Sequence, residues 1–368
     1  MLIMKPVFKL VPTAAAMFFL SVSGSHGFEL NGFADVSFTK CSRTDCRGLE
    51  DQGGHNGSFS IGELDFFAVT QMEQIDVLME VTIENGSKVD LERLTLGYTF
   101  HDALRLRVGR FHTPLGFWNP TYHHGVQVQP TIRRPQFLVF EDEGGILPTH
   151  TVGIYFSGRV KNKMFRTEYG AGAGNGEKIT VEDATVQLSP NNVSDDNPGK
   201  AVVGHLAVSP TSLPGLTVGG SGYFSRIQSD PTVASAFPPL PSVDENQVIL
   251  AAALTYAGGS LDLTGEYFSI RDRERSSGGS GTHLSRAYYG LLSYTAADRW
   301  VPYLMYETTS VAEKDPYFIN LGASDVTKAI GGIRYNLMPK SSVRAEARRV
   351  KWGDLDWSEY SVQWAIGF

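Results

Sequence analysis

A strict alternation of apolar and polar residues constrains the fold of this chain more than any other feature. In the closing stretch "SEYSVQWAIGF", alternate residues from Tyr360 to Phe368 are apolar or aromatic, and those between them are polar or small. A period of two predicts a β-strand with one apolar and one polar face. An unpaired edge on such a strand would invite aggregation. We therefore expect the strand that ends at Phe368 to pair with the first strand, so that the sheet closes.

The alternation recurs along the chain in about sixteen runs of ~8–13 residues, the length expected for tilted strands that cross a membrane. The runs begin near Phe28, Ser58, Ile75, Val89, Leu104, Thr149, Met164, Lys200, Gly215, Glu245, Ser260, His283, Trp300, Asp325, Ser341 and Trp357. Short connections such as "HDA" and "PKS" alternate with long ones such as residues 39–57 and 175–199. That order is typical of a barrel whose two ends face different compartments. The sequence therefore predicts an all-β fold: a transmembrane antiparallel up-and-down β-barrel of about 16 strands.

The N-terminal segment differs in character from the rest of the chain. Two lysines precede an apolar run over residues 10–22, and the small residues of "SHG" follow. This order is typical of a secretory signal peptide. A membrane anchor is the alternative, but the run is shorter than the ~20 residues that a spanning helix needs. We expect a signal peptide over residues 1–27 and a barrel domain over residues 28–368.

Charge and aromatic residues bear on the partners of the chain. A formal charge of −7, without a basic aromatic stripe, argues against nucleic-acid binding. Aromatic pairs recur near the ends of the expected strands: Tyr98 and Phe100, Tyr155 and Phe156, Tyr223 and Phe224, and Tyr288 and Tyr289. Such pairs are typical of the girdles that contact outer-membrane lipid, although β-propensity alone enriches the same residues in strands.

The two cysteines, Cys41 and Cys46, lie close together in "KCSRTDCRG". In an exported chain this spacing predicts one small disulfide. Two thiols without nearby histidines make a poor metal site. Closing so short a loop gains only modest entropy, so we expect the bond to protect a surface loop and not to hold the fold together.

The longest informative insert covers residues 111–148, after the fifth expected strand. It is far longer than an ordinary connection and too rich in apolar and aromatic residues for disorder. Prolines and glycines such as Pro114, Gly116 and Pro130 fix its path and do not extend a strand. We therefore predict that it folds inside the barrel as a constriction loop, against the lumen wall beside its own strand.

Within this region the stretch "LRLRVGRFHTPLG", Leu104 to Gly116, resembles a motif of the phosphate-selective porin O and P family. The resemblance implies a bacterial outer-membrane porin, trimeric and sixteen-stranded, whose loop after the fifth strand narrows the pore. Members of that family owe phosphate selectivity to many lysines and arginines near the constriction. The insert here carries Arg133 and Arg134 but also three carboxylates at positions 141–143, so phosphate selectivity stays open.

Parity along the strands and position in the insert give the residues expected to face the water path. The residues predicted to form the constriction are Arg105, Arg107, Arg110, His112, His123, His124, Arg133, Arg134, Glu141, Asp142 and Glu143. The residues predicted to line the pore wall are Glu63, Asp65, Asp76, Glu80, Arg93, Arg334, Arg344 and Arg348, with Lys328 and Glu346 on the same parity. Acidic and basic patches should occupy different sectors, and opposed charge at a narrow point orients small polar solutes. The alternative is that these charges only solvate the wall.

The histidines of the insert raise the question of a metal ion. Imidazole combined with carboxylate suits zinc, copper or nickel. However, adjacent His123 and His124 cannot easily aim at one metal ion in an extended chain, so the sequence predicts no metal site. Two other roles stay open for these residues and for His112 and His150: hydrogen bonding that packs the loop, and gating by titration near pH 6–7.

The function predicted from these features is passive diffusion through a porin in the outer membrane of a Gram-negative cell. We expect no cofactor and no enzymatic activity, since no G-x-S-x-G elbow is present and the His101–Asp102 dipeptide falls in a short turn. The expected partners are outer-membrane lipid, small hydrophilic solutes or ions, including anions such as phosphate, and further copies of the chain in a homotrimer. The alternative is an outer-membrane receptor or barrel sheath that binds a specific ligand or protein without general diffusion.

Overall fold

The computed structural model describes residues 29–44, 46, 54–84, 88–123, 126–139, 146–182, 185–188, 199–229, 233, 240–275 and 281–368. Within these ranges eighteen strands form one sheet, and sixteen of them close into an antiparallel barrel. The barrel strands are β1 (Glu29–Cys41), β2 (Ser58–Met72), β3 (Ile75–Glu84), β4 (Lys88–His101), β5 (Leu104–His112), β6 (His150–Lys161), β7 (Phe165–Asn175), β10 (Lys200–Pro210), β11 (Leu216–Ser229), β12 (Asp244–Gly258), β13 (Leu261–Glu274), β14 (Thr282–Tyr294), β15 (Trp300–Ser310), β16 (Val326–Met338), β17 (Ser341–Trp352) and β18 (Leu355–Gly367). The predicted barrel is therefore confirmed, and every predicted strand start lies within two residues of the observed one.

The barrel closes where the last strand meets the first, as the alternation at the C-terminus predicted. β1 and β18 pair antiparallel from Phe33↔Gly367 to Cys41↔Glu359. The amide N–H of Gly32 donates to the carbonyl of Phe368, and the amide N–H of Phe368 donates back, both at 3.0 Å. A Cβ at Gly32 would lie 2.5 Å from the backbone carbonyl oxygen of Asp65 and 2.6 Å from the Phe368 ring, so this close approach requires glycine. The seam leaves no open edge between these strands.

Two short strands lie outside the sixteen-strand barrel and were not predicted. β8 (Lys178–Glu182) and β9 (Thr185–Leu188) form a hairpin within the long connection that follows β7. β8 extends the sheet by a short parallel pairing with the end of β11 at Gln228 and Ser229. Strands of five and four residues give too few alternations to stand out from a polar loop.

The barrel has the reverse of the usual distribution of polar and apolar residues. On β18, Tyr360 and Trp364 are more than half exposed on the outer face, at 56% and 53%. Gln363, next to Trp364 and on the opposite face of the strand, points inward and is 3% exposed. A closed barrel with an exposed apolar outer face is the arrangement of an integral outer-membrane β-barrel. Among the described residues, no helix is both long enough and apolar enough to cross a membrane.

The predicted aromatic girdle is correct for only one member of most pairs. Phe156, Phe224 and Tyr288 are exposed on the outer face, whereas the adjacent Tyr155, Tyr223 and Tyr289 are at most 5% exposed and face the interior. The physical reason is that neighbouring residues of a strand point to opposite faces. Tyr98 and Phe100, two positions apart, are both exposed and their rings are in contact at 4.7 Å.

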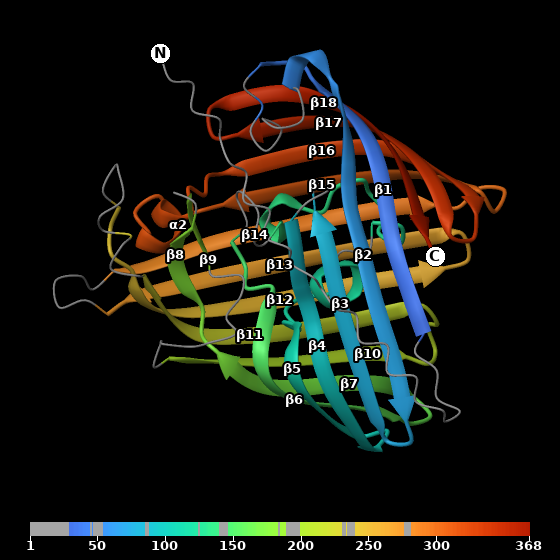
Figure 1. Cartoon of the computed structure of the whole chain (residues 1–368), viewed down its shortest axis with the longest axis vertical. Helices are drawn as coiled ribbons and strands as arrows, with labels where there is room; N and C mark the ends of the chain where they lie inside the picture. The colour runs from blue at the N-terminus through green and yellow to red at the C-terminus, as the bar shows by residue number, and fades with distance from the viewer. Residues whose placement is uncertain are drawn as a thin grey trace, which may run out of the picture.

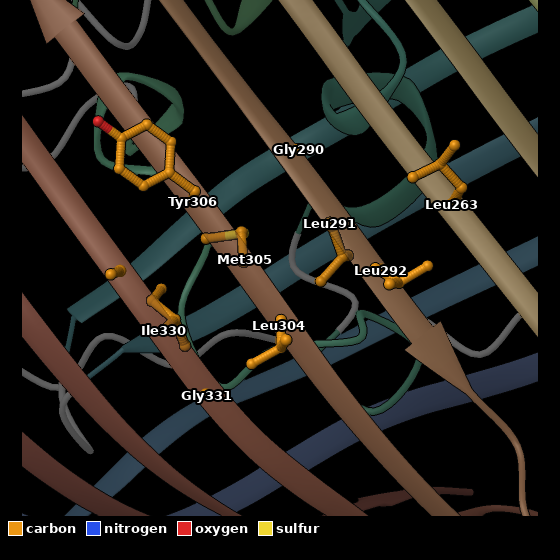
Figure 2. Close-up of a pocket in the computed structure, with 10 residues that line it drawn as sticks. Leu263, Gly290, Leu291, Leu292, Leu304, Met305, Tyr306, Ile330 and Gly331 are labelled. Atoms are coloured by element: carbon orange, nitrogen blue, oxygen red, sulfur yellow. The ribbon is translucent and has the colours of Figure 1, made fainter.

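An apolar depression of about 420 Å³ lies in the surface of the barrel wall across β13 to β16. Figure 2 shows side chains from neighbouring strands around it, including Leu263, Leu292 and Leu304. These three leucines are between 39% and 65% exposed on the outer face. Gly290 and Gly331 also line it and bring no side chain to fill the space. The depression therefore belongs to the lipid-facing wall.

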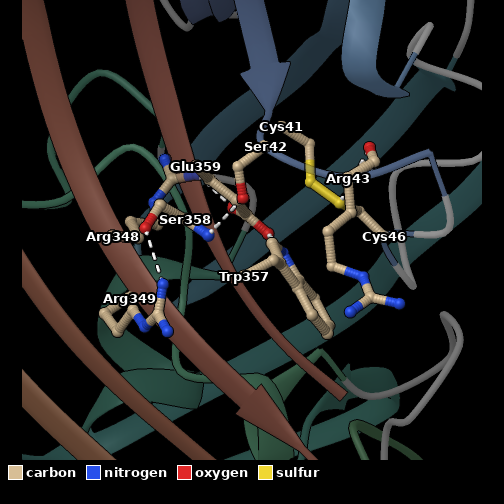
Figure 3. The surroundings of a disulfide bond; sticks show 9 residues. All are labelled: Cys41, Ser42, Arg43, Cys46, Arg348, Arg349, Trp357, Ser358 and Glu359. Atoms are coloured by element: carbon tan, nitrogen blue, oxygen red, sulfur yellow. Dashed lines mark hydrogen bonds and ion pairs between the residues drawn. A yellow bond between two sulfur atoms is a disulfide. The ribbon is translucent and has the colours of Figure 1, made fainter.

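Cys41 and Cys46 form a disulfide, but it lies deeper than a bond that protects a surface loop (Figure 3). Both cysteines are at most 1% exposed and pack in a small apolar cluster with Val326, Val350, Trp352 and Trp357. Just beyond Cys41, the amide N–H of Ser42 donates to the carbonyl of Ser358 at 2.9 Å. The bond therefore closes a short loop whose base is attached to the late strands by apolar packing and by this hydrogen bond.

Candidate functional site: the inner loop and the lumen wall

The connection from β5 to β6, residues 113–149, is here called the inner loop, and its described residues, 113–123, 126–139 and 146–149, fold into the barrel. They contain α1 (Trp118–Tyr122) and the 3-10 turn η3 (Gln136–Leu138), and Figure 1 shows them within the barrel. The apolar residues of the inner loop that are at most 2% exposed are Leu115, Trp118, Phe137, Leu138, Ile146 and Leu147. The predicted inward fold of the insert is therefore confirmed.

The wall that receives the inner loop is not the one predicted. The apolar side of the loop crosses the lumen and packs on inward residues of β11 to β16 instead of resting only beside its own strand. The ring of Phe137 lies 5.2 Å from that of Phe268, and Trp118 lies 5.5 Å from Tyr289. The physical reason is that the far wall carries buried aromatic and aliphatic residues, whereas the inward residues near the end of β5 are arginine and histidine.

Three glutamates of the far wall accept hydrogen bonds from backbone N–H groups of the inner loop. Glu266 on β13 accepts from Phe117 at 3.0 Å and from Trp118 at 2.8 Å, which satisfies the start of α1. Glu346 on β17 accepts from the N–H of Ile132, and Glu307 on β15 accepts from the N–H of Gln136 at 2.6 Å. All three glutamates are at most 5% exposed. The loop is thus held at three points along its length.

Arg344 on β17 holds the carbonyl side of the same loop. Its guanidinium donates to the carbonyls of Val126, Gln127 and Gln129 at 2.7–2.9 Å. Arg344 is 0% exposed, and Arg348 is 3% exposed and paired with Glu346 and Glu359. Both were predicted to line the pore wall. They point inward as predicted, but Arg344 binds the loop and Arg348 pairs with Glu346, which binds the loop, so both act as supports.

Two of the other predicted pore-wall residues form ion pairs with arginines of nearby strands. Asp76 pairs with Arg105, and Glu80 pairs with Arg93. Asp65 is 1% exposed, Lys328 is 7% exposed and donates to the Gln136 side chain, and Arg334 is partly buried. Because β18 and β1 alone separate β17 from β2, the basic and acidic sectors lie close together around the seam. They are not on opposite walls.

The predicted constriction residues are only partly brought together. Arg105 lies near the turn end of β5, and the rise per residue places it about 23 Å from His112. Arg107 lies on the same half of the strand. Arg133 and Arg134 are partly buried on the inner loop, and Arg134 lies 3.4 Å from Glu63 on β2. His124, Glu141, Asp142 and Glu143 lie outside the described residues.

Three of the predicted histidines converge at the start of the inner loop. His112 ends β5, His150 begins β6, and His123 directly follows α1. The ring of His112 lies 4.4 Å from that of His123 and 5.2 Å from that of His150. One ring nitrogen from each lies within 4.8 Å of the others, and all three are at most 9% exposed. We call these residues the histidine cluster.

Two wall residues, Glu92 and Arg110, complete the surroundings of the histidine cluster. Glu92 on β4 is 1% exposed, and its Oε2 lies 2.9 Å from Nε2 of His150 and 3.9 Å from Nε2 of His123. The guanidinium of Arg110 lies 3.1 Å from Nδ1 of His150. Because a guanidinium can only donate, Nδ1 accepts and the proton of a neutral ring stands on Nε2, facing Glu92.

A second group of buried acids lies under α2 (Pro316–Asn320), in the connection between β15 and β16. Carboxylate oxygens of Glu245, Asp272 and Asp315 lie within 4.8 Å of one another. Asp315 caps α2 by accepting from the N–H of Tyr317 at 2.9 Å, and burial raises the pKa of the Asp315 carboxyl. Tyr317 in turn donates to the carbonyl of Ile146, which connects α2 to the inner loop.

Glu92, Glu266 and Glu307 are the functional residues that sequence reasoning missed. Glu266 and Glu307 stand among apolar, glycine or hydroxyl residues in "TGEYF" and "MYETT", whereas Glu92 precedes Arg93 in "LERL". The available signal for Glu266 and Glu307 was parity, since each falls on the inward face of its strand. Glu92 instead shares the parity of the outward-facing Leu94 and Leu96, and it turns inward only through a β-bulge in the pairing of β3 with β4. A buried carboxylate needs a donor, and the inner loop supplies it to Glu266 and Glu307.

Comparison with known proteins supports the fold. No family model and no curated protein matches the sequence. An anion-selective porin from Comamonas acidovorans is similar in structure, with a TM-score of 0.64 and 13% identity over 93% of this chain and 100% of that one. The DcaP channel of Acinetobacter baumannii (TM-score 0.60, 10% identity, 93% and 97% covered) and the trimer form of OmpT, an outer membrane protein of Vibrio cholerae (0.59, 12%, 94% and 100%), are similar too. The chain has the fold of bacterial outer-membrane porins.

Proposed function

We propose that this protein is an outer-membrane porin, a passive diffusion channel for small hydrophilic solutes that works without a cofactor or chemical turnover. One observation carries the proposal: an inner loop folded into a closed barrel and fixed there by Glu266, Glu346, Glu307 and Arg344. A loop held in this way is a fixed constriction of the lumen and not a moving gate. The similar folds of a porin and an outer-membrane channel support the same conclusion.

We further propose a preference for anions. Among the described residues, Arg93, Arg105, Arg107, Arg133 and Arg334 of the lumen are only partly buried. The carboxylates of Glu80, Glu266, Glu307, Glu346 and Glu359 are instead at most 5% exposed. Glu63 and Asp76 are partly exposed, at 20% and 17%, and each lies against an arginine, Arg134 and Arg105. The charges nearest to water are therefore mostly guanidinium groups, which attract small anions. Phosphate is one such anion, and the stretch from Leu104 to Gly116 is the reason to test it first.

The assembly that we propose is a homotrimer, and the similar fold of the trimer form of OmpT supports it. Cross-linking in mild detergent and light scattering would test it directly. A monomeric mass together with an absence of cross-linked trimer would contradict the proposal, whatever the channel conducts.

The experiment that tests the channel is conductance of the purified, folded protein in planar lipid bilayers. We expect stepwise conductance and, in a salt gradient, a reversal potential displaced toward that of the anion. If the barrel shows the heat-dependent shift in gel mobility that marks a folded state but never conducts, a receptor or sheath is favoured instead. A hydrolytic activity that survives purification and is lost on a single substitution would favour an enzyme.

A further inference from the structure

We propose that the histidine cluster binds one Zn²⁺ ion. His112, His123 and His150 each supply one ring nitrogen, and Glu92 supplies a carboxylate oxygen. Three nitrogen ligands and one oxygen ligand make a four-coordinate set of the kind that zinc prefers. The site does not depend on conduction, so it can be tested even if the barrel is not a channel.

The geometry needs little change to reach zinc coordination. Tetrahedral bonds of about 2.0–2.1 Å place ligand nitrogens about 3.4 Å apart. The nitrogens of the cluster lie within 4.8 Å of one another, so they have to approach by about 1.5 Å at most. The objection from the adjacent His123 and His124 does not apply, because the ligands come from β5, β6 and the inner loop.

The neighbours of Glu92 hold its carboxylate toward the histidines. The hydroxyl of Thr82 donates to Oε1 of Glu92 at 3.1 Å, while Oε2 faces His150 and His123. Outer contacts of this kind orient a metal ligand and tune its affinity. Glu80, whose Oε2 lies 3.9 Å from Nε2 of His112, and Asp90, 4.0 Å from Arg110, add negative charge around a divalent cation.

Arg110 sets a condition that the site has to meet. When zinc binds Nε2 of His150, the single ring proton moves from Nε2 to Nδ1, so Nδ1 can no longer accept from Arg110. The guanidinium then turns toward Asp90, which is already within 4.0 Å of the same nitrogen. Zinc binding therefore strengthens the Arg110–Asp90 pair at the edge of the site.

A bound ion would act on the inner loop because of where its ligands come from. His112 and His150 belong to the barrel wall, and His123 belongs to the loop just after α1. Zinc would therefore join the first third of the inner loop to its own strands, on the side away from Glu266 and Glu307. We expect chelation to increase amide hydrogen exchange at residues 117–123 and to leave residues 132–139 unchanged.

The test uses the full folded barrel in detergent, stripped with EDTA, reloaded with Zn²⁺ and freed of excess metal. We expect one zinc per chain by elemental analysis, and His123→Ala should weaken binding by more than the roughly 10–100-fold that changes to outer contacts cost. His205→Ala is the matched control, because His205 faces the lumen but contacts Tyr155 at 2.5 Å, outside the cluster. This control should keep the zinc.

Co²⁺ gives a second measurement that does not depend on a variant that folds. Bound to the wild-type barrel in place of Zn²⁺, it should show the intense visible absorption of a four-coordinate nitrogen and oxygen site. Weak absorption typical of six-coordinate cobalt would overturn the proposal. It would also be overturned by a wild-type protein that retains no zinc, or by a folded His123→Ala variant that retains as much zinc as the wild type.

Discussion

Two walls of the barrel hold the inner loop, and they hold it by different chemistry. On the wall from β11 to β17, buried glutamates and Arg344 bind backbone N–H and C=O groups, and apolar side chains pack between them. On the wall from β4 to β6, the contacts are those of the histidine cluster and Glu92. Every non-proline residue offers the backbone groups, so the hydrogen bonds to the first wall depend little on which side chains the loop carries, whereas the apolar packing does depend on them. The second depends on three imidazoles, so it can respond to metal ions. The far wall thus holds the loop at both its start and its middle, and the wall near β5 adds a contact that a metal ion could change.

The largest effect should come from removing the segment that spans the two walls. Deleting Thr121 to Phe137 removes His123 and the loop residues that Glu346, Glu307 and Arg344 bind. We expect the sixteen strands to close as before, because their pairing does not involve the inner loop, and single-channel conductance to rise at least about twofold as the lumen widens. Recordings in planar bilayers would show this. A folded deletion variant with the wild-type conductance would mean that the loop does not narrow the water path.

The fold could be predicted from the sequence because its signal is local and repeated. A period of two marks each strand, and the alternation of long and short connections gives the topology. The path of the inner loop could not be predicted in the same way. It depends on which inward residues, such as Phe268, Tyr289 and Glu266, come together around the lumen, and they are far apart in sequence from the loop they bind. Length and apolar content showed that the loop needed cover, but not which wall would provide it.

A second prediction concerns the charges that the loop carries between the two walls. Replacing Arg133 and Arg134 by glutamate should move the reversal potential toward the cation value, because fixed charge at a narrow point sets the local potential. The matched control is Arg159→Glu with Arg166→Glu, which makes the same change of charge at side chains that are 66% and 56% exposed. The control should move the reversal potential much less. Equal shifts in both variants would show that total charge, and not the position of the loop, determines selectivity.

A third prediction weakens only the grip of the far wall. Glu266→Ala leaves the N–H groups of Phe117 and Trp118 and the hydroxyl of Tyr289 without their acceptor, and each buried donor left unsatisfied costs about 1–3 kcal/mol. We expect noisier open-channel current and faster hydrogen exchange over residues 117–122, with the barrel intact. Glu266→Gln keeps one acceptor oxygen and should show a smaller change of the same kind. An alanine variant as quiet and as protected as the wild type would show that apolar packing alone holds the loop.

The site could be predicted in residue type more easily than in role. Parity placed Arg344 and Arg348 on the inward face correctly, but whether an inward charge meets water or the loop depends on the path of the loop. The histidines show the converse. The insert showed that the histidines lie close together in sequence. Their convergence in space required β5 and β6 to pair so that His112 stands opposite His150. Glu92 completes the group from β4, which follows from the pairing of β4 with β5 and not from any motif.

The smallest effect should come from the disulfide, which contacts neither the far-wall residues that hold the loop nor the histidine cluster. In the chain-entropy model, closing a loop as short as the one between Cys41 and Cys46 stabilises a fold by about 2 kcal/mol. Replacing both cysteines by serine should therefore lower the midpoint of urea unfolding in detergent and leave conductance and selectivity unchanged. Burial of both sulfurs beside Trp352 and Trp357 adds a packing contribution, because serine places hydroxyls in an apolar cluster. The double alanine variant separates the two contributions, since it loses the bond without burying a hydroxyl, and it should be more stable than the double serine variant. If either variant changed conductance as much as the loop deletion does, the seam and the lumen would be coupled, and the inner loop could not be treated as held by its two walls alone.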